Sequence, residues 1–129
     1  MLTTDVRDLG EVPAQALFRR QEAADPLPRQ VLDVVAPEVL SGERIATIWS
    51  GELNRPVAYG GDDLDAFENV IRAVAPPWMA YGMRLMMRSY QHYGMQAKPG
   101  DEDTLQTLLG RPMRTYREFV REMLEAWQA

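Results

Sequence analysis

The sequence of 129 residues contains no cysteine, one histidine and one lysine. Without cysteine the chain forms no disulfide, no thiolate–zinc site and no cysteine nucleophile. A single histidine, His92, is too few for a histidine-based metal site, and neither Ser41 nor Ser50 has a histidine at a spacing typical of a hydrolase triad. These absences exclude most of the common metal and nucleophile chemistry.

Long apolar runs and basic clusters are also missing. No segment approaches the roughly 18 consecutive apolar residues of a membrane span, and the N-terminus has no apolar core of a signal peptide. The net charge is −5, which is opposite in sign to the electrostatic footprint of a nucleic-acid-binding domain. We therefore expect a cytoplasmic protein that binds neither nucleic acid nor a membrane.

Motifs that bind phosphates or transfer protons are absent as well. The nine glycines never form G-x-G-x-x-G or G-x-x-x-x-G-K-[ST], and Lys98 does not complete a Tyr-x-x-x-Lys pair. The acidic groups at 62–65 and 101–103 lack the alternation of a calcium loop and suit helix N-termini better. The sequence predicts no catalytic residue, no metal site and no cofactor binding by this chain alone.

The longest helical pattern runs from Pro76 to Met95. Pro77 suits the first helical position and Gly94 suits the end. The apolar and aromatic residues of this helix form a wide surface, so we expect it to be covered on more than one side and to organise the core of a single domain, 1–129. Its methionines and aromatics are typical of a core, and equally of an adaptable ligand wall or partner surface.

Five further helices are expected on either side of this pattern. Before it, Asp8 caps a helix that ends near Arg20, Ser41 caps a helix with apolar residues from Ile45 to Leu53, and Asp62 or Asp63 caps a helix from Leu64 to Val74. After it, Asp101 or Asp103 caps a short helix with Leu105 to Leu109, which Gly110 ends. The last helix begins with a capping box from Thr115 to Glu118 and continues from Phe119 to Trp127.

Two short β-branched runs, Gln30–Ala36 and Val57–Tyr59, are bounded by proline or glycine and are predicted to be strands. A helix lies between them, which favours a right-handed crossover with parallel strands. The expected fold class is α/β: mainly helical, with about six helices and a small two-stranded parallel β-α-β unit.

Four stretches in chain order resemble motifs of one family. They are D-V-R-D-L-G-E-V at 5–12, L-D-V-V-A-P-E at 32–38, P-P-W-M-A at 76–80, and D-E-D with L-G-R-P and T-Y-R-E-F between 101 and 119. Together they are similar to the C-terminal region of NmrA-like proteins, an atypical branch of the short-chain dehydrogenase/reductase superfamily that binds NAD(P).

The resemblance implies a substrate lobe that lies over the nicotinamide of a separate Rossmann half, which this sequence does not include. It implies NAD(P) as cofactor only when such a half is joined to the chain. No cofactor-binding residue of the family has a position here.

Three functions remain open on this basis. The first is a free-standing, non-catalytic module that binds a hydrophobic small molecule or a protein and forms a homodimer. The second is the substrate-binding lobe, or a fragment, of an NAD(P)-dependent oxidoreductase with a Rossmann-half partner. The third is a regulatory module that binds a transcription factor. Candidate ligand or interface residues, chosen by residue type, are Trp49, Trp78, Tyr81, Met86, Tyr90 and His92.

Overall fold

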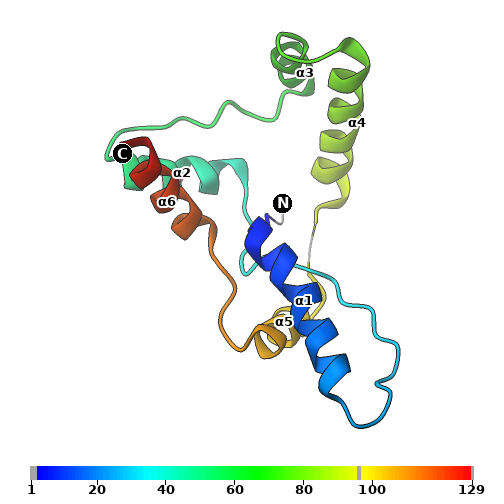
Figure 1. Cartoon of the computed structure of the whole chain (residues 1–129). Coiled ribbons are helices and arrows are strands. Elements are labelled where there is room, and N and C mark those ends of the chain that lie inside the picture. The colour runs from blue at the N-terminus through cyan, green and yellow to red at the C-terminus, as the bar shows by residue number, and fades with distance from the viewer. Residues whose placement is uncertain (1–2, 96, 129) are drawn as a thin grey trace.

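The computed structural model describes residues 3–95 and 97–128, and these form six helices joined by turns and extended segments (Figure 1). The helices are α1 Val6–Glu22, α2 Gly42–Leu53, α3 Leu64–Arg72, α4 Pro77–Tyr93, α5 Asp101–Leu109 and α6 Tyr116–Gln128. The expectation of a mainly helical chain with about six helices is confirmed.

The helices associate in three pairs: α1 with α5, α2 with α6, and α3 with α4. The first two pairs join segments from opposite ends of the chain. The third is a local hairpin that contacts no other described helix and stands apart in Figure 1, between two extended segments.

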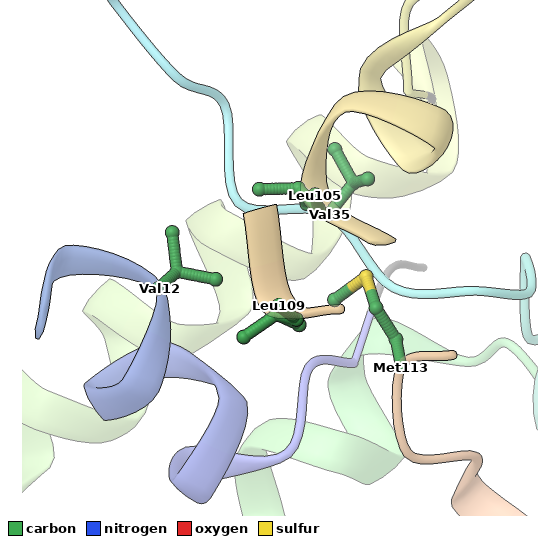
Figure 2. Packing of buried hydrophobic residues seen from close by; sticks show 5 residues of the cluster. All are labelled: Val12, Val35, Leu105, Leu109 and Met113. Atoms are coloured by element: carbon green, nitrogen blue, oxygen red, sulfur yellow. The ribbon is translucent and has the colours of Figure 1, made fainter. Parts of the chain in front are cut away.

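Buried apolar side chains form two clusters. The α1–α5 cluster is shown in Figure 2 and consists of Val12, Val35, Leu105, Leu109 and Met113. The α2–α6 cluster consists of Leu40, Ile48 and Val120, with Trp49, Tyr116 and Leu124 packed against it. The extended segment 31–40 contributes to both clusters and so connects them.

The prediction of a β-α-β unit is wrong, because the described residues contain no sheet. The run 30–36 is extended but finds no partner strand, and Val35 is instead buried against α5. At the second run, the Val57 amide donates to the Ser50 hydroxyl oxygen at 2.9 Å rather than to a neighbouring strand. Apolar packing and a side-chain acceptor replace the ladder that two isolated strands would have needed.

The prediction that α4 is covered on more than one side is also wrong for the described residues. Only Ala80 is buried in this helix, and Trp78 is 72% exposed. The helix packs on α3 alone, and the two clusters lie elsewhere.

Most of the expected helix ends are confirmed. Ser41 and Asp63 accept hydrogen bonds from amides of α2 and α3, and Gly110 ends α5 with a φ of 69°. Two caps differ. Asp5, not Asp8, caps α1, and Gly100, not an aspartate, occupies the N-cap of α5.

None of the helices in the described ranges combines the length and the apolar character that a membrane span requires.

Candidate functional site

A cleft of about 380 Å³ lies where the N-terminal segment meets α6. We call it the α6 cleft. Its lining residues are Thr3, Thr4, Asp5, Val6, Arg7, Arg114, Thr115, Tyr116, Phe119, Glu122 and Met123. The volume lies within the usual range for small-molecule sites, roughly 300–1,000 Å³.

The apolar wall of the cleft comes from α6 and the start of α1. Tyr116 and Phe119 are three residues apart on one face of α6, and their ring centroids are 5.8 Å apart at a tilt of 41°. Behind this wall, the Trp49 indole N–H donates to the Tyr116 hydroxyl at 3.1 Å. The α2–α6 cluster therefore holds the aromatic wall in place.

The capping box at the start of α6 sets the direction of this helix at the cleft. The Glu118 amide donates to Thr115 Oγ1 at 3.2 Å, and the Thr115 amide donates to Glu118 Oε2 at 2.6 Å. This confirms the prediction from sequence. The Thr115 amide is also the main reason that the pKa of Glu118 is lowered.

Charged side chains at the rim are paired with one another. Arg7 Nη2 lies 2.7 Å from Asp5 Oδ2 and 2.8 Å from Glu122 Oε2, so it joins α1 to α6. The hydrogen bond from the Arg7 side chain lowers the pKa of Asp5, and the same bond raises the pKa of Arg7. Since each of these rim charges has a partner, the described residues of the cleft offer no free charge to a ligand.

Asp8 is bound by the lining residue Arg114 and is fully buried, with 0% exposure. Its carboxylate accepts from Arg111 Nη2 at 2.7 Å, from the Arg114 amide at 2.7 Å and from Arg114 Nη1. Glu11 also binds Arg111. Burial raises the pKa of Asp8, but the bonds from Arg111 and Arg114 outweigh it, and the net pKa is lowered.

The residue Arg114 thus has two roles, because it lines the cleft and binds Asp8. Sequence reasoning took Asp8 for a helix cap and did not identify the cleft. The available signal was the motif pattern itself, since 5–12 and 109–119 are the stretches that the structure brings together.

The residues proposed from sequence lie in two separate places. Trp49 stacks on Trp127 of α6, with ring centroids 5.8 Å apart and an interplanar angle of 15°. The others are on α4, which makes no contact with α2. Of these, Trp78, Tyr81, Met86 and His92 are exposed and Tyr90 is half-buried.

His92 contacts only the neighbouring Tyr93 among the rings of the described chain, edge to face at 4.5 Å. A ligand role for the α4 residues stays a prediction. In the ranges 3–95 and 97–128, no three histidine or acidic side chains gather as they would around a metal ion.

Comparison with known proteins gives one informative match. The chain is 29% identical over 126 residues to an NAD(P)H azoreductase from Xenophilus azovorans, a match that spans 97% of this chain and 41% of that protein. No protein-family model and no solved structure matches. The chain is therefore similar along nearly all its length to a part, about two-fifths, of an NAD(P)H-linked reductase.

Proposed function

We propose that this chain is the substrate-binding lobe of an NAD(P)-dependent oxidoreductase of the NmrA-like branch, and that the α6 cleft holds an uncharged aromatic part of the substrate. The observation that carries the proposal is the similarity to an NAD(P)H azoreductase over 97% of the chain. The NAD(P) cofactor belongs to a Rossmann half outside this sequence, in keeping with the 41% of the relative that the chain spans.

The chemistry of the cleft supports an uncharged, flat ligand. Tyr116, Phe119 and Met123 supply apolar and aromatic surface, on which a planar ring stacks favourably. The rim charges of Arg7 and Arg114 are already bound to Asp5, Glu122 and Asp8. A charged ligand would have to break these pairs, whereas an uncharged ligand leaves them intact.

The direct test uses 4-phenylazophenol, an uncharged aromatic azo compound, as the probe. Equilibrium dialysis against the purified chain should show saturable binding. Phe119→Ala should weaken it roughly tenfold, because the variant removes one ring of the wall. Phe18→Ala, on an exposed part of α1 outside the cleft, is the matched control and should leave the affinity unchanged.

Equal affinity in the two phenylalanine variants, with folding verified by circular dichroism, would contradict the assignment of the cleft. The lobe hypothesis has a separate test. Reduction of the azo compound by NADPH should require a co-expressed Rossmann half and should be absent with this chain alone. Turnover by the chain alone would refute the lobe hypothesis.

The free-standing, self-associating module remains a second candidate. It is favoured by the exposed apolar side of α4, a surface that a compact monomer would ordinarily cover.

A further inference from the structure

Helix α4 carries apolar and aromatic residues on its uncovered side as well as on its covered side. The covered side is marked by Arg84, whose guanidinium binds Asp65 at 2.6 Å and Glu68 at 3.3 Å, both on α3. Ala80, one turn before Arg84, is 0% exposed. An exposed apolar surface of this kind commonly marks a protein–protein interface, so the uncovered half of α4 is a candidate for a partner.

The uncovered half has a regular seam, which we call the outer seam: Trp78, Gly82, Leu85 and Ser89. Their spacing of four, three and four residues keeps them in one row on the side opposite Ala80 and Arg84. Trp78, Gly82 and Ser89 are exposed, and Leu85 is half-buried. Large and small side chains alternate along this row.

The exposed aromatic area on α4 is a substantial part of what one partner buries in a stable dimer. Trp78 is 72% exposed, Tyr81 51% and Tyr93 79%. If each aromatic side chain offers about 200 Å², these three expose about 400 Å² together. That is half of the roughly 800 Å² that each partner contributes to a standard interface, before Met79 and Met86 of the same helix are added.

We propose that a second copy of this chain covers the outer seam, with the two α4 helices antiparallel about a two-fold axis that crosses the seam midway between Gly82 and Leu85. In this register Trp78 lies against the partner subunit's Ser89, and Leu85 lies against the partner subunit's Gly82. Each large side chain meets a small one, and the two-fold axis repeats both contacts. A parallel pair would place tryptophan on tryptophan and glycine on glycine.

The α6 cleft is not part of this interface, because α4 contributes no residue to its lining. The dimer therefore does not depend on the proposed substrate site, and the two proposals fail separately.

Sedimentation of the whole chain at about 50 µM is the first test, and it should give twice the monomer mass. Leu85→Arg places a charge in the seam and should return the mass to that of the monomer. Leu17→Arg, at a 68% exposed position of α1, is the matched control and should remain a dimer. Phe119→Ala should remain a dimer as well, whatever its effect on the azo compound.

Cysteine cross-linking tests the register, and the absence of natural cysteine makes each introduced thiol unique. A double variant that carries both Trp78→Cys and Ser89→Cys should form a covalent dimer under mild oxidation. Ser89→Cys alone should not, because two copies of position 89 would lie 11 residues, about 16 Å, apart along the antiparallel helices. A disulfide needs Cα atoms within about 7 Å.

Four outcomes would overturn the proposal. A wild-type chain that sediments as a monomer at this concentration refutes the second copy. A dimer that survives Leu85→Arg places the interface elsewhere. Cross-linking by Ser89→Cys alone refutes the antiparallel register. If the monomeric chain instead binds a Rossmann half and Leu85→Arg abolishes that binding, the seam belongs to that partner and the dimer is refuted.

Discussion

The buried carboxylate of Asp8 is the most sensitive point that the structure predicts outside the two apolar clusters. Asp8→Asn keeps the size of the side chain but removes its charge and replaces one acceptor oxygen by an NH₂ group. Among the described residues, the groups that hydrogen-bond to the Asp8 carboxylate are all donors: Arg111 and the amide and guanidinium of Arg114. An asparagine must therefore direct an N–H toward another N–H group.

The expected loss in the free energy of unfolding is about 3 kcal/mol. Hydrogen bonds to charged groups contribute about 1.5–3 kcal/mol each, and loss of one partner from a buried ion pair costs about 3–5 kcal/mol. Glu11 stays close to Arg111 and compensates in part. For a chain of this size the loss corresponds to a fall in Tm of about 10 °C.

The pH dependence gives this prediction a second readout. The pKa of Asp8 is lowered in the folded state from its ordinary value of 3.8. The charged form therefore stabilises the fold above that value, and its contribution is lost as the pH falls through the lowered pKa. The difference between wild type and Asp8→Asn should be full at pH 7 and should shrink below about pH 4.

Urea denaturation followed by circular dichroism, at pH 7 and at several acidic pH values, measures both quantities. Asp25→Asn, at an exposed position, is the matched control and should change the free energy of unfolding by less than about 0.5 kcal/mol. A loss below about 1 kcal/mol for Asp8→Asn, or a difference independent of pH, would show that Asp8 is hydrated in solution and would refute the reasoning.

Two further predictions concern the apolar clusters and the start of α6. Leu105→Ala should lower the free energy of unfolding by about 3 kcal/mol and Ile48→Val by about 1 kcal/mol, since each residue is 1% exposed. The two residues lie in different clusters, so their effects should add within about 0.5 kcal/mol in the double variant. A larger coupling energy, measured by urea denaturation, would show that the clusters form one unit. Thr115→Ala should lower the free energy of unfolding by about 1 kcal/mol, because it removes the hydroxyl that accepts from the Glu118 amide. Thr115→Ser keeps a hydroxyl at this position and should retain most of that stability. Equal thermal stability of both variants and the wild type would contradict the role of the cap.

The helix ends were predictable from sequence because their hydrogen bonds join residues within a few positions of each other. Ser41, Asp63, Pro77, Gly94 and Gly110 all lie where local preference places them. The apolar periodicity of α6 and its capping box were likewise visible in the chain. Such features depend little on distant packing, which is why they could be predicted.

The two expected strands show where local preference is insufficient. Val34 and Val35 favour an extended backbone, and the backbone there is extended. A strand also needs a neighbour to satisfy its amides and carbonyls, and no local signal specifies whether one exists. Here the valines are covered by α5, from the far side of the sequence.

The candidate site was decided by tertiary structure for the same reason. Asp8 and Arg114 are 106 residues apart, and the α6 cleft exists only because the N-terminal segment lies against α6. Composition identified which residue types could form an apolar ligand site, but not that Phe119 and Met123 would line one while Trp78 remained exposed. Amino-acid type and spacing determine local structure, whereas burial depends on which distant segments meet, and only the folded chain shows that.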